Sequence, residues 1–308
     1  MKNCVVIYNP NSGHIFSTKY LKEYKSILQK HDYNPKIIGT EYRGHAKEIV
    51  NHLDNNVDLV ISIGGDGTFN EVVSGNLERK KPLVLSHIPV GTTNDIGVMF
   101  GYGKDIIKNL KLLLNGVVKN MDICTINDHP FVYVAGFGKF MHIPYDTPRK
   151  LKKEIGYLAY LVEGAKDFFA PTKLYKLKYK VNGIEKNGYY SFMLISSANR
   201  IAGINNFYKD VKLDDDTFEV LLCNFRRRID IIKTFAMLFT TDASKVSGIE
   251  FYKTNHIELE FENYPKKAWC IDGERLDRAV LKYDIKNIRN VKIMMPKKNI
   301  NKNFIKKD

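Results

Sequence analysis

Three short polar turns carry the residues best suited to phosphate chemistry. The most distinctive follows an apolar, β-branched run and reads Gly64-Gly65-Asp66-Gly67-Thr68-Phe69-Asn70-Glu71. A strand that ends at glycines and feeds a helix points backbone N–H groups outward, and glycine lets a phosphate approach them. This stretch therefore predicts a phosphate-binding turn, although an ordinary strand-to-helix turn with an Asp cap has the same pattern.

Strand and helix patterns alternate around this turn over residues 1–122. Short apolar segments predict strands at 4–8, 35–39, 58–63 and 83–89, and helical spacing of apolar residues marks the segments between them. Such alternation predicts a doubly wound, mostly parallel sheet, whose ligands bind at the carboxyl ends of the strands. Polar, glycine-bearing turns at 9–13, 64–68 and 91–95 follow three of these strands, so we expect them to converge on one crevice.

The pattern changes near Asp122. Six segments read as antiparallel strands, at 131–135, 174–181, 189–196, 217–223, 256–261 and 279–283, and helical stretches at 152–169 and 229–239 interrupt them. We predict a second domain over 123–284 with a β-sandwich-like fold and inserted helices. A last strand at 291–295, within about 285–296, is expected to return to the first domain. Residues 297–308 form a basic tail that we expect to be frayed or surface-bound.

The bulk composition is that of a soluble globular protein with an excess of positive charge. A net charge of +14 favours an anionic partner, although lysine-rich composition alone also explains it. Nucleic acid is not expected, because no helix-turn-helix, zinc-finger or aromatic stacking signature accompanies the charge. The four cysteines are far apart in the sequence, and no apolar run approaches the ~18–20 residues of a membrane span. We expect a cytoplasmic protein with reduced thiols.

Four motifs occur in an order that resembles a known family. They are Asn9-Pro10-Asn11-Ser12-Gly13, the stretch 64–71, Gly91-Thr92-Thr93-Asn94-Asp95 and Ile271-Asp272-Gly273-Glu274. Together they resemble the diacylglycerol kinase catalytic-domain family, particularly its bacterial soluble lipid kinases, nearly end to end. The resemblance implies ATP-dependent phosphorylation of a lipid hydroxyl, foremost diacylglycerol to phosphatidic acid. It also implies that ATP binds between an α/β domain and a β-sandwich domain.

The resemblance further implies roles for individual residues. Asp272 would be the general base, and Glu274 would orient Asp272 or a water, although Asp272-Gly273 alone predicts a hairpin turn. Asp66, Asp95 and Asp122 would hold Mg²⁺ partly through water. The implied nucleotide contacts are Asn9, Pro10, Asn11, Ser12, Gly13, Thr40, Gly65, Asp66, Gly67, Thr68, Phe69, Asn70, Glu71, Thr92, Asn94 and Asp95.

A second, structural Mg²⁺ site is implied at Lys212, Asp215 and Thr217. Asp215 would supply a carboxylate, and the other two residues would supply backbone carbonyls. The family pattern has glycine where this sequence has Asp216, so we expect Asp216 to adopt a left-handed conformation at some cost. An acidic surface hairpin is the alternative interpretation.

A lipid substrate implies transient, peripheral contact with an anionic membrane surface. Arg226-Arg227-Arg228 ahead of an apolar helix and the lysine-rich tail are the candidate contacts. The alternative is that Ile232, Phe235, Ala236 and Phe239 are simply the core-facing stripe of that helix.

Other functions remain open at this stage. In one alternative, the protein is a lipid kinase whose phosphate acceptor is phosphatidylglycerol, a long-chain base or a prenol. An NAD kinase shares the Gly-Gly-Asp-Gly-Thr loop but carries a further Asn-Glu pair, which occurs here only at Asn70-Glu71. A third alternative is a non-catalytic, basic membrane-binding protein. The sequence also leaves a homodimer open.

Overall fold

The protein forms two compact units. The computed structural model describes residues 1–12, 18–147, 158–201, 204–205, 208, 211–240, 245–246, 248–276 and 279–305. Unit 1 comprises Met1–Met121 and Arg289–Asp308, and unit 2 comprises Asp122–Ile288. Gly13 and the first part of the predicted helix at 152–169 lie outside the described residues.

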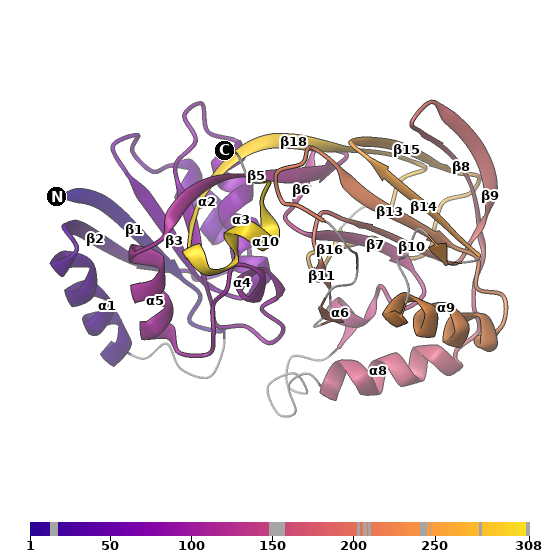
Figure 1. The fold of residues 1–308 in the computed structure, drawn as a ribbon, viewed down its shortest axis with the longest axis horizontal. Coiled ribbons are helices and arrows are strands. Elements are labelled where there is room, and N and C mark those ends of the chain that lie inside the picture. Colours follow the sequence, from indigo (N-terminus) through magenta and orange to yellow (C-terminus); the bar gives the residue numbers. More distant parts are fainter. Residues whose placement is uncertain are drawn as a thin grey trace. The chain divides into compact units, whose positions relative to one another are not determined.

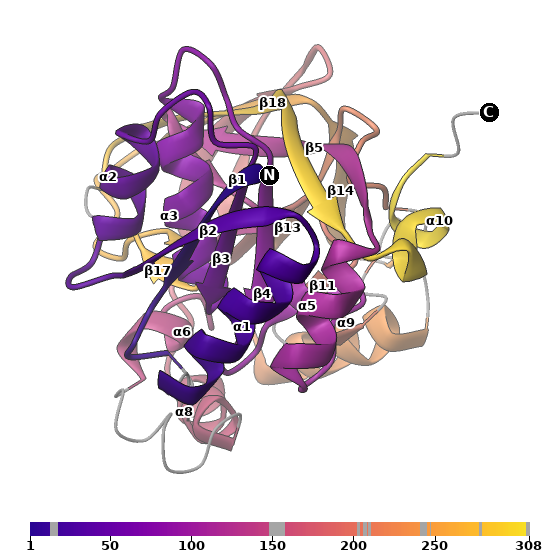
Figure 2. The ribbon, with the colours of Figure 1, turned by 90° about the vertical axis from the view of Figure 1, so that its left-hand side faces the viewer.

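Unit 1 is built on a parallel sheet. Its strand order is β2 (Tyr33–Gly39), β1 (Lys2–Tyr8), β3 (Leu59–Gly64), β4 (Leu85–Pro89) and the C-terminal part of β18 (Lys282–Met295). Helices α1 (Thr18–Lys30) and α5 (Ile106–Leu114) lie on one face, and α2 (His45–Asn51) and α3 (Asp66–Leu77) on the other (Figure 2). The predicted doubly wound, mostly parallel sheet is confirmed. Because helices cover both faces, β3 is buried along its whole length.

Two further features complete unit 1. The short helix α4 (Asp95–Met99) follows β4, and Asp105 caps α5 by accepting a hydrogen bond from the backbone N–H of Lys108 at 2.9 Å. The C-terminal segment is folded, with a 3-10 turn at Lys297–Asn299 and helix α10 at Ile300–Asn303. Asn303 donates to the Met99 carbonyl, and Phe304 is buried. An aromatic and an amide side chain therefore anchor residues 297–305, which matches the surface-bound alternative rather than the frayed one.

Unit 2 is a sandwich of two antiparallel sheets (Figure 1). One sheet has the order β14 (Ile249–Thr254), β13 (Phe218–Cys223), β10 (Phe192–Ser196), β7 (Val134–Gly138), β16 (Cys270–Ile271) and β17 (Glu274–Arg275). The other contains the N-terminal part of β18, β15 (His256–Phe261), β8 (Tyr175–Val181) and β9 (Ile184–Tyr190). Burial alternates along β8, which is the period of a strand with one face in the core. The sandwich prediction is confirmed.

Helices and small strand pairs complete unit 2. Strand β5 (Val117–Ile126) begins in unit 1 and ends in unit 2. The other elements of unit 2 are β6 (His129–Phe131), α6 (Ile143–Asp146), α8 (Leu158–Phe169), β11 (Arg200–Ile201), β12 (Ile204–Asn205) and α9 (Arg228–Thr240). An aromatic cluster of Phe137, Tyr175, Phe261 and Trp269 fills the core between the sheets. The strand predicted at 291–295 is the C-terminal part of β18 and pairs with β4 of unit 1, as expected. The strand predicted at 279–283 is not a separate element, because residues 282 and 283 begin β18 and residues 279–281 precede it. The polar stretch between them hid the continuity from a reading based on apolar residues.

A buried histidine in unit 1 connects its stability to pH. His87 in β4 is fully buried, lies 3.3 Å from the Ser62 hydroxyl and stacks on Phe69. Burial lowers the pKa of His87 from 6.5 to about 3. The folded protein therefore keeps this imidazole neutral under conditions in which the unfolded chain binds a proton.

We expect unit 1 to lose stability in mild acid through His87. Between pH 6.5 and about 3 only the unfolded chain is protonated there, so the free energy of unfolding falls as the pH drops. The slope is up to about 1.4 kcal/mol per pH unit. His87→Met should flatten this slope in denaturant unfolding measured at about pH 7 and pH 5. An equal loss of stability in both proteins would contradict the assignment.

Candidate active site

The three polar turns lie at one edge of the unit 1 sheet. In the parallel register Tyr8 pairs with Ile63, and Gly64 pairs with Pro89, so β1, β3 and β4 end side by side. The turn after each strand consequently starts at the same level. This is the edge where open α/β sheets bind their ligands.

Two glycines allow the second and third turns to touch. A Cβ atom on Gly91 would lie 2.7 Å from the Cα atom of Gly65 and 3.0 Å from Oδ1 of Asn94. A side chain at position 91 would push the turns apart, so this position requires glycine for close backbone approach, whereas a Cβ on Gly65 would meet only the Gly91 Cα atom, at 3.6 Å. The glycine pattern seen in the sequence thus has a packing role as well as a proposed phosphate-binding role.

The Asp66 carboxylate ties the same two turns together. It accepts hydrogen bonds from the backbone N–H groups of Asp95 at 3.1 Å and Ile96 at 3.2 Å, and from the Thr93 hydroxyl at 3.3 Å. Asp66 is the first residue of α3, and its carboxylate therefore caps the start of α4. Asp66 and Asp95 are both buried. These two predicted metal ligands are brought together, with the carboxylate of one bound to the backbone of the other.

Other predicted nucleotide contacts also stabilise the turns. Asn9 accepts a hydrogen bond from the Asn11 N–H at 2.9 Å and donates to the Thr68 hydroxyl at 3.4 Å. Asn94 has a left-handed φ of 52° and bonds both polar groups of the Gly91 backbone. These contacts make the loops rigid before any ligand binds.

Glu71, Phe69 and Thr40 have structural contacts of their own. Glu71 accepts from the backbone N–H groups of Gly44 at 2.8 Å and Ala46 at 3.2 Å, at the start of α2. Phe69 is buried and packs on His87 and Phe100. The buried Thr40 donates its N–H to the Tyr8 carbonyl at 2.8 Å. The remaining predicted contacts that the structure describes are partly or fully accessible, apart from Thr68, which is buried: Pro10, Asn11, Ser12, Gly67, Asn70 and Thr92.

The predicted second metal site forms a charged turn in unit 2. Asp215 accepts from the Thr217 hydroxyl at 2.7 Å through Oδ1, and from Lys253 Nζ at 2.7 Å through Oδ2. Asp216 has a left-handed φ of 64°, as its position in the motif required. Its N–H donates to Asp122 Oδ2 at 2.7 Å, so Asp122 joins this turn. Burial raises the pKa of Asp122, and hydrogen bonds from Asp216 and Asn287 oppose the rise.

The Asp215 carboxylate at the 212–217 turn has a lysine partner in the structure. Lys253 occupies Asp215 Oδ2 and lies 3.9 Å from the buried Glu219, so a lysine ammonium already supplies positive charge there. Across the described residues, no three side chains of the His, Cys, Asp and Glu types form a group able to hold a metal. The motif analysis missed Lys253, although it is the cross-strand partner of Glu219.

The predicted catalytic residues lie in a hairpin turn of unit 2. Asp272 and Gly273 connect β16 to β17 and have positive φ angles of 48° and 86°. The buried Asp272 carboxylate accepts backbone hydrogen bonds from Val132 at 2.6 Å and from Tyr133 and Val134 at 3.1 Å. The Glu274 side chain is exposed. Asp272 therefore forms the hairpin turn that the Asp-Gly dipeptide predicted, and its carboxylate is also held in one orientation.

The chain combines an α/β unit, whose three polar turns lie at the carboxyl ends of its strands, with a β-sandwich, and comparisons show which known proteins it resembles. Residues 3–126 match the family model described as diacylglycerol kinase catalytic domain. The chain is 28% identical over 300 residues to a diacylglycerol kinase of Bacillus subtilis strain 168, covering 96% of this chain and 97% of the relative.

Further relatives agree over nearly the whole chain. A diacylglycerol kinase of Staphylococcus epidermidis strain ATCC 12228 is 27% identical over 311 residues, with 100% of this chain and 96% of the relative covered. The crystal structure of a diacylglycerol kinase from Bacillus anthracis strain Sterne superposes with a TM-score of 0.80 at 23% identity, covering 97% and 99% of the two chains. Residues 3–126 are thus similar to the diacylglycerol kinase catalytic domain, and the resemblance seen in the motifs is confirmed.

Gly91→Ala should separate the two glycine turns and weaken ATP binding at least tenfold. The new Cβ would lie 2.7 Å from the Gly65 backbone, and relieving such overpacking costs about 1–3 kcal/mol. Gly103→Ala is the matched control, because a Cβ there meets no atom within 4 Å. Calorimetric titration with ATP and denaturant unfolding measure both effects. Unchanged ATP affinity in Gly91→Ala would show that the turns do not bind the nucleotide.

Lys253→Met should lower the free energy of unfolding by about 1–2 kcal/mol, because it leaves the Asp215 and Glu219 carboxylates without their cation. Lys282→Met removes an equally charged lysine from the exposed pair with Glu260 and should cost less than about 0.5 kcal/mol.

The melting temperature of the wild-type protein should be the same in MgCl₂ and in EDTA. A drop in EDTA would restore the metal interpretation of the turn.

Proposed function

We propose that this protein is an ATP- and Mg²⁺-dependent lipid kinase that transfers the γ-phosphate of ATP to the hydroxyl of diacylglycerol, giving phosphatidic acid. The observation that carries the proposal is the convergence of the turns after β1, β3 and β4. The Asp66 carboxylate and the Gly65–Gly91 contact hold two of these turns together. The Asn9–Thr68 hydrogen bond adds the third.

Backbone groups of these turns suit the phosphates of ATP. Gly65 precedes α3 and supplies no side-chain cap, so a ligand can complete the first turn of this twelve-residue helix. Asp66 and Asp95 would hold Mg²⁺ beside the phosphates, and the ion would supply positive charge there. The Asp66 oxygens accept three hydrogen bonds, so the Asp66 and Asp95 region fits an ion reached through water.

Asp272 is the proposed acceptor of the hydroxyl proton. As the acceptor oxygen bonds to the γ-phosphorus, its O–H bond breaks toward this carboxylate, and the bond from the phosphorus to ADP breaks. Three backbone N–H groups orient the carboxylate. Phosphoryl transfer through a loose transition state depends more on the position of the base than on its strength, so a carboxylate held in one orientation suits this role. The exposed Glu274 would assist through water.

Diacylglycerol resides in a bilayer, so we propose peripheral binding to an anionic membrane surface. Within the described ranges, no helix has the length and hydrophobicity needed to span a bilayer. Arg226, Arg227 and Arg228 are exposed, and Ile229 and Ile232 on α9 are 43% and 52% exposed. The exposure of Ile232 favours membrane contact over the core-stripe alternative. Phe235 and Phe239 have no described side chains.

The decisive assay incubates the protein with labelled ATP, Mg²⁺ and mixed micelles that offer one acceptor at a time. The acceptors are diacylglycerol, phosphatidylglycerol, a long-chain base and a prenol, with NAD as a soluble acceptor. We expect labelled phosphatidic acid to be the main product. A labelled product from NAD alone would favour the soluble-substrate alternative, and no product from any acceptor would refute a kinase.

Asp272→Asn should reduce kcat at least about 10²-fold while ATP affinity stays within twofold, because the amide cannot take the proton. Asp128→Asn is the matched control. Asp128 also occupies a hairpin turn with a left-handed φ, of 66°, but its carboxylate is 92% exposed. The melting temperature shows whether either variant is misfolded. Near wild-type turnover in a folded Asp272→Asn variant would assign the proton to another group.

A further inference from the structure

A pocket in unit 2 is lined by lysines that the proposed chemistry does not use. Its volume is about 250 Å³, and its lining residues are Gly138, Lys139, Asp167, Pro171, Lys173, Tyr175, Lys266 and Lys267. Four ammonium groups and a single carboxylate surround this space. We call it the lysine pocket.

Hydrogen bonds hold the two residues at the floor of the pocket, Lys139 and Asp167, in place. Lys139 is buried, and its Nζ donates to the carbonyls of Ala170, at 2.7 Å, and Asp167. The Asp167 carboxylate accepts the Phe140 N–H at 2.7 Å and lies 3.7 Å from the His142 ring. The pocket's one acid is thus held by backbone and histidine, and the backbone carbonyls fix the Lys139 chain.

The other three lysines present their charge without acidic partners. Lys173 lies over the Tyr175 ring at 5.0 Å, and Lys267 Nζ lies 3.2 Å from Nδ1 of His142. In the part of the chain that the structure describes, neither they nor Lys266 form an ion pair. Burial lowers the pKa of Lys139, and the nearby Lys267 and Arg228 cations lower it further against the opposing effect of Asp167. A bound anion would relieve this repulsion.

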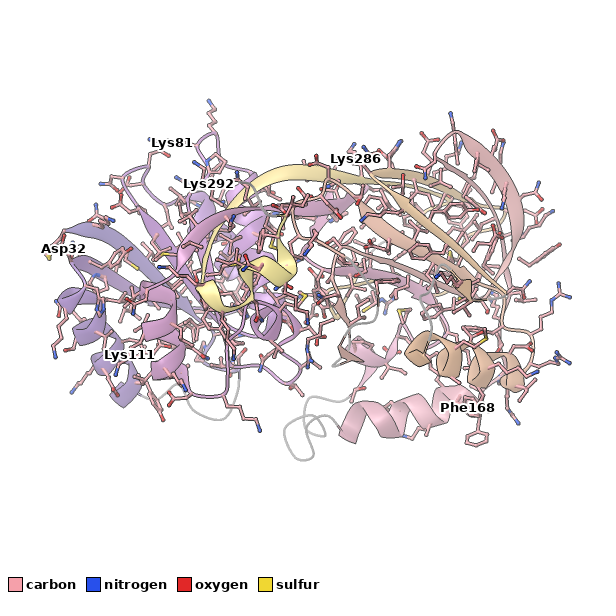
Figure 3. The ribbon with its side chains drawn as sticks, in the orientation of Figure 1. Asp32, Lys81, Lys111, Phe168, Lys286 and Lys292 are labelled. Atoms are coloured by element: carbon pink, nitrogen blue, oxygen red, sulfur yellow. The ribbon has the colours of Figure 1, made fainter. Side chains whose placement is uncertain are left out.

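The size and charge of the pocket fit a phosphate group, and its surroundings favour a lipid as the source. Phe169 and Tyr264, each two residues from a lining residue, are 64% and 70% exposed. The neighbouring Phe168 side chain projects away from α8 (Figure 3). Arg228 at the start of α9 donates to the Phe169 carbonyl at 2.9 Å, which connects the pocket to the exposed isoleucines of that helix. Exposed aromatic rings beside cations are typical of a membrane interface.

The lysine pocket is separate from the proposed base. The Asp272 N–H donates to the Val134 carbonyl at the start of β7, whereas the pocket begins at Gly138 at the end of the same strand. Four residues of strand span about 13 Å. A phosphate in the pocket would therefore not be the one that is transferred.

We propose that the lysine pocket binds the phosphate of an anionic phospholipid headgroup and so holds the protein on the membrane that contains its substrate. The proposal rests on the proposed function, in which the substrate lies in a membrane. The phosphate oxygens would accept hydrogen bonds from the Lys173, Lys266 and Lys267 ammonium groups, and Lys139 would supply fixed charge beneath them.

The test compares two variants that remove equal charge. Lys266→Gln with Lys267→Gln changes the pocket, and Lys80→Gln with Lys81→Gln changes exposed lysines of unit 1, where Lys81 points away from the chain (Figure 3). Sedimentation with phosphatidylcholine vesicles containing phosphatidic acid, without ATP, measures binding. A second vesicle carries equal negative charge as oleate, and a third arm titrates inorganic phosphate by calorimetry.

We expect the pocket variant to bind phosphatidic acid vesicles about tenfold more weakly than wild type, and the control variant to stay within about twofold. Equal losses in the two variants, or equal losses on oleate and phosphatidic acid vesicles, would overturn the pocket in favour of general electrostatic attraction. Inorganic phosphate that binds as tightly as the vesicles would overturn the lipid source. Misfolding is excluded if both variants phosphorylate a dispersed short-chain diacylglycerol at the wild-type rate.

The assays also separate this proposal from the proposed function. A wild-type protein with no kinase activity that still needs Lys266 and Lys267 for phosphatidic acid vesicles would refute the kinase and support the pocket. An active kinase whose vesicle binding does not depend on these two lysines would support the kinase and overturn the pocket.

Discussion

The Asp66 carboxylate is the contact on which the candidate active site depends. It starts one helix and caps the next, because the first N–H groups of α4 have no partners within their own helix. This single side chain fixes the distance between the turns after β3 and β4. The glycines at 65 and 91 then allow the turns to touch. Asp66, Asn9 and Asn94 bind other parts of the motifs, which supports the backbone as the proposed surface for phosphates.

In unit 2 a lysine ammonium, rather than backbone N–H groups, compensates a cluster of negative charge. Asp122, Asp215 and Glu219 gather near one turn, where Coulomb repulsion would destabilise the fold if nothing compensated it. Lys253 supplies the compensating charge from the neighbouring strand β14. A lysine is part of the chain and cannot dissociate, whereas a bound cation depends on its concentration.

The hairpin at Asp272 shows that a structural and a functional interpretation of one dipeptide are compatible. Asp272 and Gly273 have the positive φ angles that a two-residue hairpin requires. The same geometry turns the carboxylate toward three backbone N–H groups at the start of β7. A residue in a tight turn is therefore also held in one orientation, which a group that must meet a reacting hydroxyl needs.

Local patterns in the sequence determined the elements and the family. Apolar runs that end in glycine turns predicted β1, β3 and β4, the alternation predicted a parallel sheet, and Asp216 had to take a left-handed conformation. Only the tertiary structure decided which groups these residues contact. Asp66 meets residues 29 and 30 positions away, and Lys253 meets an aspartate 38 positions away. Phe304 is buried although lysines surround it in sequence. Periodicity and turn chemistry act over a few neighbouring residues, whereas hydrogen-bond partners depend on which distant strands the topology brings together.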